Sequence, residues 1–273
     1  MSTRASPQQD GGSVNRAARI AAAASALERA HRIHAPFDAL ADAAPADAAE
    51  AYAIQDEVAR RLRPRGGDRI CAWKTGGPDA GTTPIAAPIP ASRLFDSGAI
   101  LDSDAFHFIA IEAELAYTLG RDLPPRAIPY TEADLMDAIV SLHAAIEICD
   151  SRLANHRTAS ALWKLADNQS NRALVVGPPY RDWRRILPGE LTTSVEVDGE
   201  PLAQATGTHP YGDPLRLLPW LANHCATRCG GLRAGDVITT GAWTGMHFVA
   251  PGARVVVRFA EVGEARVGFS AGQ

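Results

Sequence analysis

The sequence predicts an α+β fold with a large mixed sheet. Its first third has mainly helical patterns, whereas strand-like segments dominate from residue 69 onward, with turn signals between them and few helices. The elements neither alternate regularly between strand and helix nor form a purely β series, and no internal repeat is found. With 273 residues, the chain is long enough to bury a substantial core as one large domain with a smaller appendage.

Composition limits the classes of partner and compartment. Lys plus Arg number 27 against 31 Asp plus Glu, a net charge of -4 without blocks of one sign, so we expect no nucleic-acid partner. The apolar runs are far shorter than a membrane-spanning helix, and four scattered cysteines are too few for a disulfide framework. Residues 1–16 lack the apolar stretch of a secretory signal, and we predict a disordered tail there. We therefore expect a cytoplasmic protein without membrane association.

Helices are predicted at the start of the chain. Residues 17–33 carry apolar side chains at helical spacing. Residues 47–63 begin at Asp47, which suits an N-cap, and Glu50 three residues on completes a capping box. Apolar periodicity predicts further helices at residues 131–143, 157–164 and 214–229.

Strands and one long loop account for most of the remainder. A strand-like segment at residues 70–74 precedes a stretch to Pro90 that is crowded with Gly, Thr and Pro. A loop of this length inside a compact domain is usually disordered or functional, for instance an active-site lid. Further strands are predicted at residues 106–119, 144–149, 173–176, 191–197, 236–240 and 254–259.

Two glutamates on one predicted strand give the strongest chemical signal. Side chains alternate along a strand, so Glu112 and Glu114 share one face while Ile111 and Ala113 lie on the apolar opposite face. Adjacent carboxylates repel unless solvent, a basic partner or a divalent cation compensates them, and oxygen ligands favour Mg²⁺ or Mn²⁺. The alternative interpretation is a solvated strand face.

Further acidic residues interrupt the predicted strand that ends near residue 149. Glu147 and Asp150 stand among apolar residues, and buried carboxylates need partners. A cation shared with Glu112 and Glu114 would be such a partner, and Arg152 could pair with Asp150 next to this cation. The alternative is a structural ion pair between Asp150 and Arg152 at the end of the strand.

Lys74 follows an apolar strand and precedes Thr75-Gly76-Gly77, at the start of the long loop. Desolvation there would lower its pKa and make it a usable acid or base, although most lysines are solvated surface residues. The glycines do not form a nucleotide-binding loop, because no Lys-Ser or Lys-Thr pair follows the last of them.

Two polar segments are weaker candidates for contacting a ligand. Asp167 and Asn168 lie between a predicted helix and a strand, and Thr240 and Gly241 follow another strand. Both segments also fit ordinary turns. The cluster of His224, Cys225 and Cys229 lacks a second ligand pair, so core packing explains it better than zinc.

Six segments in order resemble the 2-keto-4-pentenoate hydratase and 4-oxalocrotonate decarboxylase branch of the fumarylacetoacetate hydrolase superfamily. They are Ala51-Tyr52-Ala53-Ile54-Gln55, Lys74 before Thr-Gly, Ile111-Glu112-Ala113-Glu114 with Leu119-Gly120-Arg121-Asp122-Leu123, residues 145–152, Leu165-Ala166-Asp167-Asn168, and residues 235–241. The resemblance covers nearly everything after residue 17.

The resemblance implies a mixed β-sheet roll with a smaller N-terminal helical region, and homo-oligomeric assembly. It implies a divalent metal, Mg²⁺ or Mn²⁺, held by Glu112, Glu114 and, by position, Glu147. Lys74 would transfer the proton beside a 2-oxo acid, with the following loop as a lid. We accordingly expect residues 17–85 to form the helical region and lid, and residues 86–273 the metal-binding catalytic domain.

The predicted activity is metal-dependent addition of water to a 2-hydroxy-2,4-dienoate in the breakdown of aromatic compounds. Asp167, Asn168, Thr240 and Gly241 would orient this small-molecule substrate. No histidine lies between His34 and His107, whereas C–C bond hydrolases of the superfamily usually carry a His-Glu pair in the lid. The alternatives are a 4-oxalocrotonate-type decarboxylase and a non-catalytic subunit that binds an oxo acid or assembles with an enzyme.

Overall fold

The computed structural model describes residues 11–62 and 67–272. Within them the chain forms two compact units, residues 11–62 with 151–170 and residues 67–150 with 171–272. The boundary predicted after residue 85 is displaced, because β1 (Ile70–Gly76) and β2 (Ile85–Pro90) hydrogen-bond into the large sheet of the second unit. The chain then returns to the first unit at residue 151.

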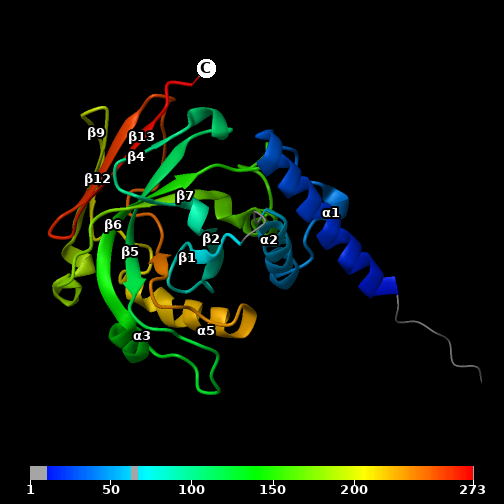
Figure 1. The fold of residues 1–273 in the computed structure, drawn as a ribbon, viewed down its shortest axis with the longest axis horizontal. Helices are drawn as coiled ribbons and strands as arrows, with labels where there is room; N and C mark the ends of the chain where they lie inside the picture. The colour runs from blue at the N-terminus through cyan, green and yellow to red at the C-terminus, as the bar shows by residue number, and fades with distance from the viewer. Residues whose placement is uncertain (1–10, 63–66, 273) are drawn as a thin grey trace, which may run out of the picture. The chain divides into compact units, whose positions relative to one another are not determined.

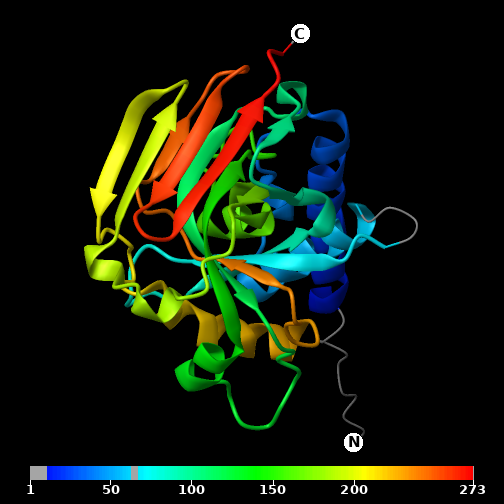
Figure 2. The same ribbon diagram turned by 60° about the vertical axis from the view of Figure 1, so that its left-hand side comes forward.

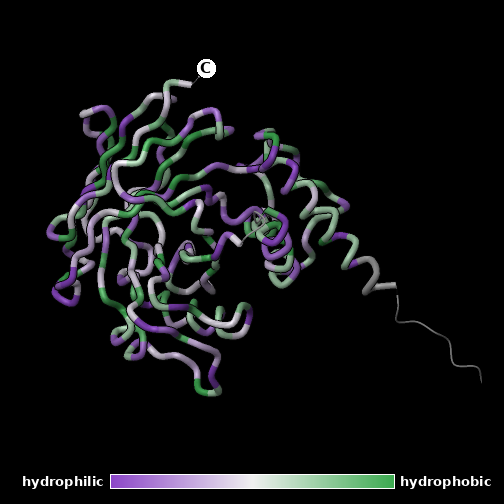
Figure 3. Tube along the Cα trace, viewed as in Figure 1, coloured by the Kyte–Doolittle hydropathy of each residue, from purple (hydrophilic) through white to green (hydrophobic). Residues whose placement is uncertain are grey.

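The first unit is helical. Its α-helices in the described residues are α1 (Gly11–Ile33), α2 (Ala48–Leu62) and α4 (Ala161–Ala166). Hydrophobic and hydrophilic residues alternate along α1 and α2 (Figure 3), and Leu27 and Ile54 are fully buried. Helix α1 begins inside the tail predicted for residues 1–16; residues 1–10 of that prediction lie outside the described residues.

The predicted N-terminus of α2 is confirmed. The Asp47 carboxylate accepts a hydrogen bond from the Glu50 backbone N–H at 2.8 Å. This N–H lies in the first turn of the helix and has no hydrogen-bond acceptor within the helix itself. The Glu50 carboxylate accepts from the backbone N–H of Ala46 at 3.0 Å and from Arg19 at 2.7 Å. Both hydrogen bonds lower the pKa of Glu50, and the one from Arg19 has the larger effect. This pairing joins α1 to α2.

A mixed sheet forms the centre of the second unit (Figure 1). In the described residues it has eight strands, seven in the order β2-β1-β10-β5-β6-β7-β3 and β11 paired to β5. The further strands are β3 (Leu94–Asp96), β5 (Ala110–Leu119), β6 (Ile139–Cys149), β7 (Asn171–Val176), β10 (Val237–Thr239) and β11 (Met246–Phe248). The α+β prediction with a large mixed sheet is confirmed.

A second sheet packs against strands of the first. It contains five strands among the described residues, in the order β4-β13-β12-β8-β9. Figure 2 shows β8 and β9 in yellow beside β12 in orange and β13 in red. The strands are β4 (Ala99–Leu101), β8 (Thr192–Val197), β9 (Glu200–Thr206), β12 (Arg254–Phe259) and β13 (Gly263–Phe269). Strands β12 and β13 contact β6, so the buried core lies between the sheets.

Two sequence predictions were wrong in this unit. The helix predicted for residues 131–143 ends early, since α3 spans Glu132–Ala138 and β6 starts at Ile139. The loop predicted to run to Pro90 is confined to residues 77–84, because β1 continues to Gly76 and β2 occupies residues 85–90.

The helix predicted for residues 214–229 is present as a 3₁₀ turn followed by α5 (Leu218–Arg228).

Two expectations from composition can be compared with the structure directly. None of the four cysteines forms a disulfide. Among the described residues, no helix combines the length and the apolar character that crossing a bilayer requires.

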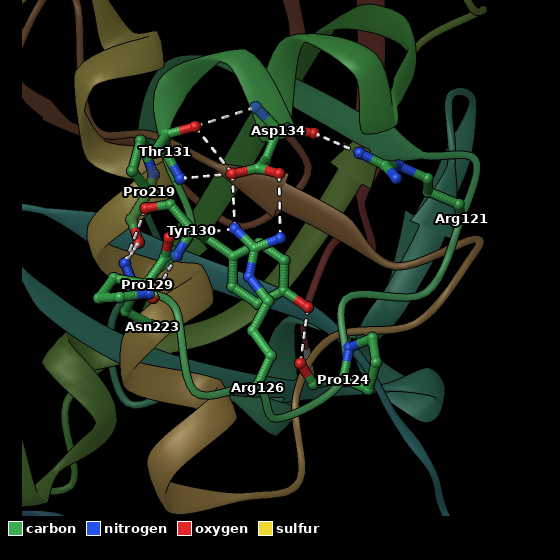
Figure 4. Close-up of polar contacts among 9 residues, drawn as sticks. All are labelled: Arg121, Pro124, Arg126, Pro129, Tyr130, Thr131, Asp134, Pro219 and Asn223. Atoms are coloured by element: carbon green, nitrogen blue, oxygen red, sulfur yellow. Dashed lines mark hydrogen bonds and ion pairs between the residues drawn. The ribbon is translucent and has the colours of Figure 1, made fainter.

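A network of polar contacts fastens the loop before α3 (Figure 4). Thr131 caps α3 in a capping box with Asp134. The guanidinium of Arg126 forms two hydrogen bonds to Asp134, at 2.6 and 3.0 Å, and lies 3.7 Å over the Tyr130 ring. The side-chain amide of Asn223 on α5 binds both backbone polar groups of Tyr130, at 2.7 and 3.0 Å.

Replacing Asn223 with Ala should lower the free energy of unfolding by about 1–3 kcal/mol, because the backbone N–H of buried Tyr130 loses its acceptor. Urea denaturation followed by circular dichroism measures the change. Asn223→Asp keeps an acceptor oxygen and loses the amide donor, so it should cost less than Asn223→Ala. Equal losses in the two variants would contradict the importance of the Tyr130 N–H bond.

Candidate active site

Three carboxylates meet on one face of the large sheet. Strands β5 and β6 are antiparallel with Glu112 directly opposite Glu147, and Glu114 follows Glu112 on the same face. The opposite face of β5 carries Ile111 and Ala113, both completely buried in the core. The predicted alternation of this strand is therefore confirmed. Glu114 and Glu147 are themselves fully buried.

Lys74 reaches the same carboxylates from β1. The parallel pairing of β1 with β10 sets Lys74 beside Thr239, and β10 in turn pairs with β5. Lys74 Nζ donates a hydrogen bond to Glu147 Oε1 at 2.9 Å and lies 2.8 Å from Oε2. It also lies 3.4 Å from Glu112 Oε2. The sheet thus brings together all four residues that the sequence predicted for proton transfer and metal binding.

Charge compensation dominates the electrostatics of this cluster. Burial by itself would lower the pKa of Lys74, but the Glu147 and Glu112 carboxylates outweigh it and hold that pKa well above its usual value. The sequence-based expectation of a lowered pKa for Lys74 is therefore wrong in direction. Burial, followed by repulsion from Glu147, raises the pKa of Glu114 well above its usual value. Burial also raises the pKa of Glu147, against the attraction of Lys74.

Neutral donors fix the two buried carboxylates. The Thr239 hydroxyl and the Gly241 backbone N–H both donate to Glu114 Oε2, the latter at 2.9 Å. Gly241 has φ of 102°, a conformation that favours glycine and turns its N–H toward the carboxylate. The side-chain amide of Asn171 on β7 donates to Glu147 Oε1 at 2.9 Å.

The carboxylate cluster fits a divalent cation. Glu114 Oε1 is buried and accepts no hydrogen bond from a donor group of the described residues; its neighbour is the Glu147 carboxyl, and two carboxyl groups form a hydrogen bond only when they share a proton. One ammonium group cannot neutralise three carboxylates, and an oxygen-only donor set is the type that Mg²⁺ or Mn²⁺ prefers. Glu112, Glu114 and Glu147 are therefore the side chains that could hold such an ion.

Two of the predicted substrate-orienting residues support this cluster in the structure. Gly241 donates to Glu114 as described above. The Thr240 hydroxyl donates to the Leu115 carbonyl at 2.9 Å, and the Thr240 carbonyl contacts His209 Nε2 at 2.8 Å. These bonds hold the turn that follows β10 in place.

The other two predicted substrate residues lie in the first unit. The Asp167 carboxylate is buried and forms an ion pair with Arg152 at 2.5 Å, and it also accepts from the Ser151 hydroxyl at 2.7 Å. Asn168 begins a short 3₁₀ turn with φ of 56°. Arg152 thus pairs with Asp167, while its expected pairing with Asp150 stays a prediction. The Asp150 carboxylate accepts the backbone N–H groups of residues 107 and 108, at 3.2 and 3.3 Å.

The loop after β1 is fastened at one point. The Tyr211 hydroxyl donates to the Thr82 carbonyl at 2.8 Å, and a Cβ on Gly77 would lie 2.5 Å from that hydroxyl oxygen. Close packing therefore requires glycine at position 77. The function of this loop as a lid stays a prediction.

Sequence reasoning overlooked Thr239 and Asn171. Each is a polar residue at the end of an apolar strand, Thr239 closing β10 and Asn171 opening β7. That position was a usable signal, but only the strand pairing reveals which carboxylate each residue contacts.

The chain matches the family model for the fumarylacetoacetate (FAA) hydrolase C-terminal domain over residues 53–269. It therefore belongs to this family, as the resemblance predicted, and its similar proteins carry enzyme names. A 2-keto-4-pentenoate hydratase from Paraburkholderia phymatum is 32% identical over 266 residues, covering 92% of this chain and 98% of the relative. A 4-oxalocrotonate decarboxylase from Pseudomonas putida is 27% identical over 227 residues, covering 81% of this chain and 85% of the relative.

A solved structure supports the same fold. The 4-oxalocrotonate decarboxylase from Pseudomonas putida G7, complexed with magnesium and adipate, superposes with a TM-score of 0.81 at 26% identity. The match covers 92% of this chain and 97% of the decarboxylase. The fold predicted from the resemblance is thereby confirmed.

Replacing Thr239 with Val removes one donor to Glu114 at nearly constant shape. We expect the affinity for Mg²⁺ or Mn²⁺ to fall about 10–100-fold, because losing a residue that hydrogen-bonds a metal ligand typically weakens metal binding by this factor. Isothermal titration calorimetry of the metal-free protein measures it. Thr193→Val on β8 is the matched control, because its buried hydroxyl donates to the Arg258 carbonyl in the second sheet. Equal losses in both variants would contradict the specific role of Thr239.

Proposed function

We propose that this chain is a divalent-metal-dependent hydratase that adds water to a 2-hydroxy-2,4-dienoate of the 2-keto-4-pentenoate type. The observation that carries the proposal is the contact of Lys74 Nζ with two of the three clustered carboxylates, at 2.8 and 3.4 Å. This combination of a cation site and an adjacent proton carrier suits a 2-oxo acid substrate. Similarity to named 2-keto-4-pentenoate hydratases over most of the chain supports the choice of reaction.

In this proposal Glu112, Glu114 and Glu147 hold Mg²⁺ or Mn²⁺. The bound cation supplies Lewis-acid stabilisation of negative charge on the substrate carboxylate and 2-oxygen. The solved decarboxylase structure contains magnesium, which supports a divalent cation of this class. Thr239 and Gly241 orient Glu114, while Asn171 orients Glu147, so these two carboxylates keep their places when charge around them changes.

Lys74 moves the proton. Its Nζ is held between Glu112 and Glu147, which positions an ammonium beside a 2-oxo acid bound at the carboxylates. Overall, the 2-hydroxyl of the dienoate loses its proton and the terminal carbon gains one, which leaves a ketone conjugated with one double bond. Water then adds across this double bond. The oxygen of water bonds to the carbon distal to the ketone, and one proton is delivered to the adjacent carbon. The net change is the gain of one water.

A 4-oxalocrotonate-type decarboxylase is the second candidate. The superposition with the solved decarboxylase over 92% of this chain favours it specifically. The same carboxylate cluster and Lys74 would serve, because the charge left after loss of carbon dioxide resembles the charge that forms during ketonisation. Its substrate carries a second carboxylate, so turnover of a dicarboxylic dienoate with release of carbon dioxide distinguishes it. A non-catalytic oxo-acid-binding or assembly subunit would turn over neither substrate.

We further propose a cytoplasmic homo-oligomer that acts in the breakdown of aromatic compounds. The four cysteines without disulfides suit a reducing compartment, and oligomeric assembly follows from the resemblance to the family. Analytical ultracentrifugation tests the assembly; a monomer at micromolar concentration would contradict it.

An absorbance assay tests the proposed reaction. The metal-stripped protein should leave 2-hydroxypenta-2,4-dienoate unchanged, and addition of Mg²⁺ or Mn²⁺ should consume it with a product one water heavier by mass spectrometry. Glu114→Gln should abolish the metal-dependent turnover, because it removes a charged ligand. Glu196→Gln on β8 is the control and should retain it, since Glu196 pairs with Arg258 away from the cluster. Turnover in Glu114→Gln equal to the wild type would contradict the metal assignment.

Replacing Lys74 with Met separates proton transfer from metal binding. We expect kcat to fall about 10²–10⁴-fold, because the variant loses the acid–base group, while the protein still binds Mg²⁺. Steady-state kinetics and calorimetry measure the two effects. The other lysine of the chain, Lys164, provides Lys164→Met as a control with unchanged kcat. A kcat within a few-fold of the wild type in Lys74→Met would remove this residue from the mechanism.

A further inference from the structure

A cysteine lies beside the carboxylate cluster, and the proposed reaction does not use it. On β6, Cys149 follows Glu147 by two residues, so both side chains leave the sheet on the same face. One ligand atom each from Glu112, Glu147 and Cys149 can be chosen so that all three lie within 4.8 Å of one another. Cys149 is completely buried.

The placement of Cys149 differs from that of a packing residue. Its neighbours Ile146 and Ile148 point to the opposite face and belong to the apolar core. A buried cysteine on that face would be an ordinary packing residue, because a free thiol behaves as a small hydrophobic side chain. Cys149 instead shares its face with Glu112 and Glu147. Strand alternation therefore assigns the sulfur to the charged cluster.

The three atoms are close enough to be drawn together on a single ion. Zinc lies about 2.3 Å from a thiolate sulfur and about 2.0–2.2 Å from a carboxylate oxygen, so tetrahedral zinc holds two such ligands about 3.5 Å apart. The three atoms, all within 4.8 Å of one another, reach this spacing with side-chain movements of about 1 Å. The buried Glu114 Oε1, which accepts no hydrogen bond from the described residues, is an independent sign that the cluster is built for a cation.

Sulfur changes which ions the cluster prefers. Mg²⁺ prefers carboxylate and water oxygens, whereas a thiolate adds affinity for zinc and related transition metals. We propose that Cys149 Sγ joins Glu112 and Glu147 to bind a thiophilic divalent cation such as Zn²⁺, Co²⁺ or Cd²⁺. This thiolate mode is an alternative to the oxygen-only mode that holds Mg²⁺ or Mn²⁺.

The thiolate mode rests on the metal centre of the proposed function and extends it. On binding, the Cys149 thiol releases its proton to solvent and the sulfur bonds the ion, with no change in oxidation state. Since Glu112 and Glu147 belong to both modes, a thiophilic ion and Mg²⁺ exclude one another. Zinc would therefore compete with Mg²⁺ for this protein.

Cobalt provides a direct spectroscopic readout. Titration of the metal-stripped protein with Co²⁺ should produce a near-ultraviolet sulfur-to-cobalt charge-transfer band. Cys149→Val and Cys149→Ser should both lack the band, and Zn²⁺ affinity should fall at least about tenfold, the lower limit for loss of a supporting residue. Two variants are used so that a folding defect in one, detected by circular dichroism, leaves the other as the test.

Cys71→Val is the matched control. Cys71 is also a buried cysteine of the large sheet, on β1, but it does not belong to the group of Glu112, Glu147 and Cys149 that can share a metal ion. It should keep the band. A band that persists in both Cys149 variants, or a wild-type protein that binds Co²⁺ without a band, would overturn the proposal.

The dienoate assay separates this proposal from the proposed function. Metal-dependent hydration by the wild type without a cobalt–sulfur band retains the hydratase and removes the thiolate mode. A band that depends on Cys149, in a protein that turns over no dienoate, retains the thiolate mode and removes the hydratase.

Discussion

The repulsion among three carboxylates on one sheet face is the constraint on which the rest of the site depends. Glu112, Glu114 and Glu147 are fixed close together by the register of β5 and β6, two of them without solvent exposure. Charge this concentrated in a medium of low dielectric constant needs compensation. Lys74 supplies one positive charge, whereas burial, followed by the charge of Glu147, raises the pKa of Glu114. A cation is the partner that completes the balance.

Sheet topology supplies the compensation from distant parts of the sequence. Lys74 and Thr239 are far apart in the chain, yet the parallel pairing of β1 with β10 sets them side by side. The antiparallel pairing of β10 with β5 then directs the turn at Gly241 toward Glu114. Because each contact is made through backbone pairing, the geometry is set by the core of the sheet rather than by flexible side chains. Such rigidity is what preorganised catalysis requires.

Local patterns predicted the parts of this site that depend on local sequence. Alternation placed Glu112 and Glu114 on one face, and the Asp47 cap was read correctly from its spacing. The start of β6 was missed because Ile139 and Leu142 continue the apolar period of α3, and only pairing with β5 favours a strand there. The contacts of Thr239 and Asn171 with the carboxylates could not be predicted for the same reason, since one sequence does not show which strands pair.

Two buried acidic sites among the described residues, Asp167 and the sheet cluster, differ in a way that separates structural from proposed chemical roles. Asp167 has one arginine for one carboxylate, and hydroxyl and backbone donors occupy its oxygens, so its charge is fully compensated. The sheet cluster has one lysine for three carboxylates, and Glu114 Oε1 accepts no hydrogen bond from the described residues. A satisfied pair stabilises the fold without a ligand, whereas an uncompensated cluster in a buried place is stable only when something else enters. Uncompensated charge, rather than acidity as such, therefore identifies the site of chemistry.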